Sequence, residues 1–325
     1  MKGPREALLA AAACLFALAA AEGLCRIFQL GPGFHSISIT NWGAEYRFSE
    51  DRELLYEPKP GSGRFNAAGY IGPLYGRPRP GQKRIALLGD SVLYGVGVDE
   101  LRTFAALFRR RHEAECQVLN FAVPGYDLTQ YVRLLETRVL PYRPDAAIIA
   151  VCFNDGATAS GELNFLMEEA RRKGSSFIQS HLRQEGWRRE LLRSQLYRFV
   201  RFSVLGRRSA GTEDPPAPSY ELSGRRYQDL GRRLLAVQEK HGVAIRFILL
   251  PAAEAARSRE LGAIRSGLEP FGFELWDLHR ELHGSRPPGS IRSLFLAKKD
   301  IWHYNEKGHE QLFQAIEAGR GRLKL

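Results

Sequence analysis

Cysteine is scarce in this chain of 325 residues, which has four, and none of them forms a CxxC pair or a Cys/His cluster. The sequence therefore indicates no metal site, and we expect neither a metal nor a cofactor. Cys116 and Cys152 are expected at the start of one parallel strand and at the end of a nearby one, roughly 20 Å apart, which disfavours a disulfide between them. Internal repeats and nucleic-acid-binding motifs are also lacking, so we expect no nucleic-acid partner.

Acidic residues are in deficit: 47 Lys and Arg stand against 36 Asp and Glu, which gives a net charge of +11 and a pI near 9.7. This balance favours acidic partners such as an anionic polysaccharide or a membrane surface, although a basic surface that is simply solvated is an equal alternative. The hydrophobic fraction of 44% and the charged fraction of 26% are those of an ordinary globular protein. The length allows one large domain or two small ones.

The N-terminal apolar segment is shorter than a comfortable membrane span. Lys2 and Arg5 precede fifteen unbroken apolar residues, 7–21, where about 18 to 20 are needed to cross a bilayer. Residues 1–30 are thus a signal anchor, extended by tilting or snorkelling, or a signal peptide cleaved at the small residues 19–21 and followed by secretion. A buried N-terminal helix is a third alternative. We favour the anchor, with the body of the chain on the extracytoplasmic side, because positive charge precedes the segment.

Sustained periodicity is missing from residues 31–83, which are rich in glycine, proline and aromatic residues. We interpret them as an irregular extension wrapped on the main domain, residues 84–325. Within that domain, residues 157–225 form an insertion that combines a predicted amphipathic helix with a polar, proline-rich loop at 209–219. Residues 157–241 contribute +6 of the net charge, so the insertion is expected to be basic and to border the pocket as a lid.

Near-continuous apolar runs alternate with helix-like stretches from residue 84 onward. Such strands are typical of a parallel sheet covered by helices on both faces. We therefore predict an α/β fold with a flavodoxin-like, doubly wound sheet of five parallel strands. The expected strands are residues 84–90, 117–123, 145–155, 244–250 and 273–278.

Polar residues follow these strands, and the loops after neighbouring parallel strands meet at one edge of the sheet, where ligands bind. The residues at these loops are Gly89, Asp90 and Ser91 after the first strand, Asn120 and Gly125 after the second, Asn154 and Asp155 after the third, and Asp300 and His303 beyond the last. We therefore expect side chains far apart in the sequence to share one pocket.

The chemistry of these side chains is complementary. A serine hydroxyl becomes a good nucleophile when a base takes its proton, and His303 suits that role for Ser91. Asp300, three residues before His303, can accept a hydrogen bond from the other ring nitrogen. The backbone N–H groups of Ser91 and Gly125 and the side-chain amide of Asn154 can stabilise an oxyanion. This set is what acyl transfer from an ester requires.

In these motifs the sequence resembles the SGNH hydrolases, also called GDSL-type esterases. Their Gly-Asp-Ser, glycine, Asn-Asp and Asp-x-x-His blocks match in order and approximate spacing over residues 84–156 and 243–313. Residues 65–73, FNAAGYIGP, resemble a segment that precedes the first block in membrane-anchored bacterial members. The resemblance implies the SGNH hydrolase fold and the same roles for Ser91 and for the other residues named above. One departure is Cys152, which stands where the family usually has glycine and is expected to crowd the pocket or shift the strand.

Structural alternatives remain for several of these residues. The Gly-Asp-Ser triplet is also a good turn sequence. Asn120 and Asn154 can close their own loops through side-chain to backbone bonds. Asp155 fits a bracing role better than contact with substrate. His309 is an alternative base, but we expect it inside the final helix and it lacks the Asp-x-x spacing.

The sequence therefore predicts a carboxylic ester hydrolase that acts on O-acetyl or short-chain esters through a Ser-His-Asp triad and an acyl-enzyme. Its substrate is expected to be an acyl ester, of the anionic or acetylated polysaccharide class or of lipid. An O-acetyltransferase acting on cell-envelope or exported polysaccharide is the first alternative, because the same residues serve both reactions. A non-catalytic envelope binding or assembly protein on a degenerate hydrolase scaffold is the second.

Overall fold

The computed structural model describes residues 3–28, 30, 45–51, 53–152, 155, 194–200, 204, 220–251, 258–283, 290–296 and 303–323. The chain divides into two units. The first comprises residues 1–43 and 170–216, and the second comprises residues 44–169 and 217–325.

The first unit contains the helices α1 (Pro4–Ile27) and α9 (Gln195–Arg198). Proline at its start suits α1, because the first helical N–H needs no partner. Its segment Leu8–Ile27, 20 residues with mean hydropathy 2.1, is long and apolar enough to cross a membrane, and a signal sequence has the same properties. Glu22 interrupts this segment, and its carboxylate accepts hydrogen bonds from the Ser194 hydroxyl at 2.7 Å and the Leu196 N–H at 2.8 Å. One end of α9 is therefore capped by a side chain of α1.

The second unit is built on a five-stranded sheet in the order β4-β3-β5-β6-β7, and every pair is parallel. The strands are β3 (Lys83–Leu88), β4 (Cys116–Asn120), β5 (Ala146–Val151), β6 (Ala244–Leu249) and β7 (Leu275–Asp277). In chain order the arrangement is second, first, third, fourth, fifth, which is the flavodoxin order. All six residues of β5 are buried, as expected for a strand covered on both faces. The predicted fold class is confirmed.

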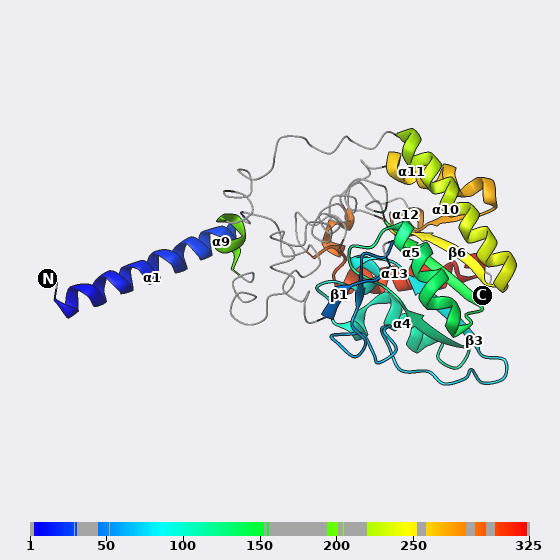
Figure 1. Ribbon diagram of the computed structural model, residues 1–325, viewed down its shortest axis with the longest axis horizontal. Helices are drawn as coiled ribbons and strands as arrows, with labels where there is room; N and C mark the ends of the chain where they lie inside the picture. The colour runs from blue at the N-terminus through cyan, green and yellow to red at the C-terminus, as the bar shows by residue number, and fades with distance from the viewer. Residues whose placement is uncertain are drawn as a thin grey trace. The chain divides into compact units, whose positions relative to one another are not determined.

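Helices flank the sheet in two groups, α4 with α13, and α10 with α5 and α11 (Figure 1). Their bounds are α3 (Ser91–Tyr94), α4 (Phe104–Arg111), α5 (Leu128–Leu134), α10 (Tyr220–His241), α11 (Ser258–Leu268), α12 (His279–His283) and α13 (Glu306–Ala318). The helix α4 begins only at Phe104, because Thr103 is extended and its hydroxyl caps α4 by accepting from the Ala106 N–H. A short 3₁₀ turn, Glu100–Arg102, precedes it.

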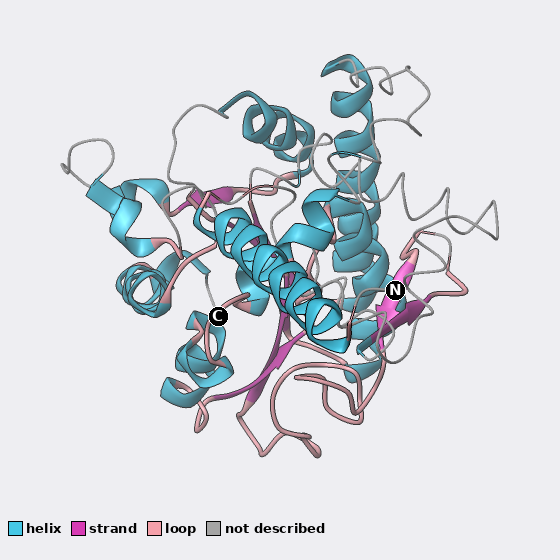
Figure 2. Ribbon diagram, turned by 90° about the vertical axis from the view of Figure 1, so that its left-hand side faces the viewer, coloured by secondary structure: helices cyan, strands magenta, loops and turns pink. Residues whose placement is uncertain are grey.

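Part of the predicted extension forms an antiparallel pair, β1 (Tyr46–Phe48) with β2 (Tyr56–Pro58), drawn in magenta with the other strands in Figure 2. Further along, the Ile71 N–H donates to the Asn120 carbonyl at 2.8 Å. This contact covers the end of the edge strand β4, whose backbone would otherwise be open to another chain.

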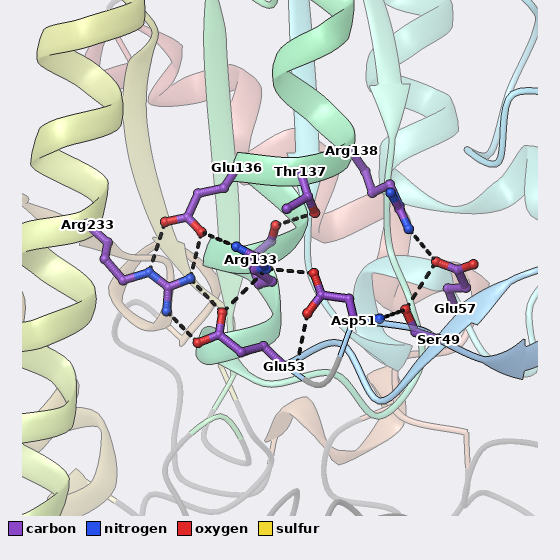
Figure 3. A network of polar contacts seen from close by, with 9 residues as sticks. All are labelled: Ser49, Asp51, Glu53, Glu57, Arg133, Glu136, Thr137, Arg138 and Arg233. Carbon is purple, nitrogen blue, oxygen red and sulfur yellow. Dashed lines mark hydrogen bonds and ion pairs between the residues drawn. The ribbon is translucent and has the colours of Figure 1, made fainter.

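Ion pairs fasten the extension to the helices α5 and α10 (Figure 3). Arg133 Nε lies 2.7 Å from Asp51 Oδ2, and Arg233 bridges the carboxylates of Glu53, at 2.8 Å, and Glu136, at 2.6 Å. Arg138, in the π turn that continues α5, contacts Glu57 of β2 at 2.9 Å in the same network. The segment around β2 is thus held in place from both sides.

Candidate active site

The turn that carries Ser91 follows β3 at the carboxyl end of the sheet. A side chain at Gly89 would place Cβ 2.8 Å from the Leu93 side chain and 3.2 Å from the Ala150 carbonyl oxygen, so only glycine fits. Asp90 then caps α3, since its Oδ1 accepts from the Val92 N–H at 2.9 Å. Ser91 is therefore the first residue of a helix at the point between β3 and β5 where the chain reverses its direction across the sheet. Doubly wound folds bind their ligands at this point.

The structure brings Ser91 and His303 together across 212 positions of sequence: His303 Nε2 lies 2.9 Å from Ser91 Oγ. Both side chains are buried, with relative exposures of 9% for Ser91 and 3% for His303. The backbone of His303 is held by its neighbours, because the Leu296 N–H donates to the His303 carbonyl at 2.9 Å and Asn305 caps the following helix α13. At this distance a neutral imidazole can accept the proton of the serine hydroxyl.

The loop after β4 lies beside the Ser91 turn. The Val123 N–H donates to the Gly89 carbonyl at 3.0 Å, and Gly125 follows two residues later with a positive φ of 83°. In the described part of the chain, neither the Gly125 N–H nor the Ser91 N–H has an acceptor. Both groups are therefore available to a ligand.

Two predicted site residues, Asn154 and Asp300, lie outside the described residues. Their roles, as oxyanion donor and as partner of His303, stay predictions. Asn120 has the structural contact expected of a loop asparagine, since its Oδ1 accepts from the Ala122 N–H at 3.0 Å.

Two buried carboxyl groups, those of Asp90 and Asp155, lie close to Ser91. Asp155 accepts hydrogen bonds from the Cys152 N–H at 2.7 Å and the Tyr131 hydroxyl at 2.8 Å. Burial, and then the neighbouring charge of Asp90, raise the pKa of Asp155 well above its ordinary value, which favours the protonated acid. Asp90 Oδ2 lies 3.3 Å from Ser91 Oγ. The side chain of Asp155 thus contacts the backbone after β5 and the helix α5, which agrees with a bracing role.

Two members of this cluster, Cys152 and Tyr131, make contacts that the sequence did not indicate. The thiol of Cys152 is within hydrogen-bonding reach of the carboxyl groups of both Asp90 and Asp155, and burial followed by those two charges raises its pKa well above the ordinary value. The thiol is therefore protonated and faces two carboxyl groups, whereas from the sequence we expected it to crowd the pocket or shift the strand. Tyr131 lies 24 positions from Asp155, and no local sequence motif indicates their contact.

His309 is placed inside α13, as expected, and is fully buried. Its Nδ1 accepts from the Phe104 N–H at 3.3 Å at the start of α4. Burial, aided by the charges of Arg64 and His303, lowers the pKa of His309 to about 3. It is a neutral acceptor that joins two helices, so its contacts are those of a structural histidine.

The site thus combines a serine hydroxyl, an imidazole against it and two backbone donors at the carboxyl edge of a parallel sheet. Such a set can carry nucleophilic attack on a carbonyl carbon and hold the resulting oxyanion. No group of three His, Cys, Asp or Glu that could hold a metal ion occurs within the residues described.

No protein-family model and no curated protein matches the chain. Solved structures similar to it include a lipase/acylhydrolase from Enterococcus faecalis, with 17% identity and a TM-score of 0.42 over 74% of this chain and 97% of that one. The esterase EstA from Pseudoalteromonas sp. has 11% identity and a TM-score of 0.44 over 74% and 98%. A G-D-S-L family lipolytic protein from Desulfitobacterium hafniense has 12% identity and a TM-score of 0.39 over 72% and 99%. At such values, the function must be argued from this chain's own residues.

Proposed function

We propose that the chain is a serine esterase that hydrolyses acyl esters through a covalent acyl-enzyme. The observation that carries this proposal is the distance of 2.9 Å between Ser91 Oγ and His303 Nε2, at the edge of the sheet where doubly wound folds bind ligands. A serine hydroxyl within hydrogen-bonding distance of an imidazole is the nucleophile and general base of many enzymes that form a covalent intermediate.

In this mechanism Ser91 Oγ attacks the ester carbonyl carbon while His303 takes the hydroxyl proton. The N–H groups of Ser91 and Gly125, with the Asn154 side chain, stabilise the tetrahedral oxyanion. His303 then returns the proton to the leaving alcohol, and water, activated by the same imidazole, hydrolyses the acyl-enzyme. Asp300 orients the ring and stabilises its charged form.

The first test is the turnover of short acyl esters, together with labelling by a fluorophosphonate. We expect Ser91→Ala and His303→Ala to lower kcat by roughly 10⁴- to 10⁶-fold, and Asn154→Ala by roughly 10²- to 10³-fold. Wild type should be labelled by the probe and Ser91→Ala should not.

The matched control is His309→Gln, which removes the other histidine of the same segment and retains an acceptor for the Phe104 N–H. It should keep wild-type turnover at neutral pH. Absence of labelling in wild type would reject the esterase and favour a non-catalytic envelope protein.

The proposed substrate class is an O-acetyl or other short acyl ester on an anionic envelope polysaccharide, reached from the extracytoplasmic face of the membrane. The net charge of +11 supports an anionic substrate, and the apolar segment Leu8–Ile27 supports a location at the membrane. Product analysis with an acyl donor and an acceptor sugar separates hydrolysis from acetyl transfer: free acetate indicates the hydrolase, and an acetylated sugar the transferase.

A further inference from the structure

The loop that carries Gly125 is a tight turn of defined type. Its four residues are Val123 to Tyr126, and the Tyr126 N–H donates to the Val123 carbonyl at 3.1 Å. Pro124 occupies the second position and Gly125, with φ of 83°, the third, which is the pattern of a type II turn. A type I turn accommodates the same ends, but its central peptide group faces the other way.

This central peptide group consists of the Pro124 carbonyl and the Gly125 N–H. Because a trans peptide is planar, its C=O and N–H point in opposite directions, so whatever holds the carbonyl also sets the direction of the N–H. The turn type therefore decides where the proposed oxyanion donor points.

The Tyr56 hydroxyl donates a hydrogen bond of 2.7 Å to the Pro124 carbonyl oxygen. Tyr56 has no exposed surface, and its ring packs edge-on against that of Tyr126, with centroids 5.1 Å apart. In return, the Tyr126 hydroxyl donates to the Tyr56 carbonyl. β2 and the turn are thus joined by two reciprocal hydrogen bonds in a dry environment, where such bonds are strong.

Tyr56 is itself firmly held. Its neighbour Leu54 is fully buried, and the Leu54 carbonyl accepts from Gln130 Nε2 of α5 at 2.9 Å. On the other side, Glu57 is paired with Arg138 in the network of Figure 3. The tyrosine hydroxyl is therefore a fixed point to which the turn is attached.

We infer that Tyr56 is a positioning residue of the active site: by holding the Pro124 carbonyl it keeps the turn in type II and aims the Gly125 N–H at the reacting carbonyl. This inference rests on the proposed esterase function. It gives the N-terminal extension a part in catalysis, since β2 supplies a hydrogen bond without which the oxyanion donor is no longer preorganised.

The test is Tyr56→Phe, which keeps the ring and removes only the hydroxyl. We expect kcat on a short acyl ester to fall by roughly 10- to 100-fold, less than the loss of a whole oxyanion donor, with KM within about twofold of wild type. Affinity for a boronic acid, which forms a tetrahedral adduct on Ser91, should fall in the same proportion. Burial raises the pKa of the Tyr56 hydroxyl well above its ordinary value, so the loss should be the same at every pH from 6 to 9.

The matched control is Tyr70→Phe. Tyr70 is also buried, with 1% exposure, and its hydroxyl also donates to a proline carbonyl, that of Pro73 at 3.0 Å. The same hydroxyl accepts from the Tyr75 N–H at 3.1 Å, so Tyr70→Phe removes two hydrogen bonds. It should cost at least as much stability as Tyr56→Phe and leave kcat and boronate affinity unchanged. Titrating active sites with a fluorophosphonate, followed to completion, counts folded molecules only, so kcat is comparable even for a less stable variant.

The outcomes separate the two proposals. A wild-type protein that neither hydrolyses esters nor reacts with the fluorophosphonate overturns the esterase itself. An active wild type with a Tyr56→Phe variant that matches Tyr70→Phe in kcat and boronate affinity leaves the esterase intact and overturns the role of Tyr56.

Discussion

At the scale of single residues, burial favours the neutral form of some titratable groups near the active site, among them Asp155 and His309. His309 is the clearest case, because its Nδ1 accepts the Phe104 N–H and, among the described residues, its Nε2 has no hydrogen-bond partner. Protonation would turn the acceptor into a donor facing another donor. The folded protein therefore resists binding a proton that the unfolded chain binds readily.

This difference makes His309 a source of acid sensitivity. Its pKa falls from an ordinary 6.5 to about 3, so between these pH values the unfolded state binds more protons and stability decreases as the pH is lowered. The contribution is at most about 1.4 kcal/mol per pH unit. We expect His309→Gln to flatten the dependence of the free energy of unfolding on pH between 6.5 and 3, measured by urea unfolding.

The exposed His241 at the end of α10 provides the control for this measurement. His241→Gln should retain the wild-type slope. If His309→Gln has the same slope as wild type, then His309 takes up its proton in the folded protein and is not the neutral helix link described above.

At the scale of elements, the extension is a docked part of the domain. Asp51, before β2, is paired with Arg133 of α5 at 2.7 Å, and the side chains are 14% and 36% exposed. Burial raises the pKa of Asp51, but the hydrogen bond and charge of Arg133 outweigh burial and lower it. The pair should therefore contribute to stability above the ordinary carboxyl pKa and lose that contribution as the pH falls below it.

A double-mutant cycle measures this contribution. We expect Asp51→Ala and Arg133→Ala to show a coupling energy of about 0.5–1 kcal/mol at neutral pH, reduced in 1 M salt, by urea unfolding of the full chain in mild detergent. The pair Arg232 and Asp229, 63% exposed on each side, should show almost none. Equal coupling for the two pairs would mean that burial adds nothing to the network.

The sheet order, the position of Ser91 and the approach of His303 follow from sequence patterns of buried strands and polar loops. What the sequence could not reveal are contacts set by packing over long distances. Tyr56 lies 68 positions from Pro124, in a segment without periodicity. Nothing in the sequence around Tyr56 indicates which carbonyl group its hydroxyl contacts. At Thr103 a local rule decides the structure: the threonine caps α4 and separates it from the preceding turn Glu100–Arg102.

At the scale of the whole molecule, the contact between Glu22 and α9 bears on the fate of the N-terminus. Cleavage at residues 19–21 would remove most of α1 and leave Glu22, which contacts α9, at the new N-terminus. We expect the protein, expressed in a Gram-negative host, to be found in the membrane fraction. Its intact mass should include residues 1–30, and a soluble chain starting near residue 22 would contradict the anchor.

The charge of the whole chain makes a prediction of another kind. The chain has 47 basic and 36 acidic residues. Any attraction of this charge for polyanions is weakened by salt, because the Debye length shortens from about 10 Å at 0.1 M to about 3 Å at 1 M. If charge recruits the substrate, kcat/KM for an acetylated polyuronate should fall about tenfold as salt rises from 0.05 to 0.5 M. An acetylated neutral glucan presents the same ester without negative charge. Its kcat/KM should therefore hardly change with salt. Parallel salt curves for the two polymers would show that the basic surface is only solvated, and the preference for an anionic substrate would then have to be abandoned while the chemistry at Ser91 stands.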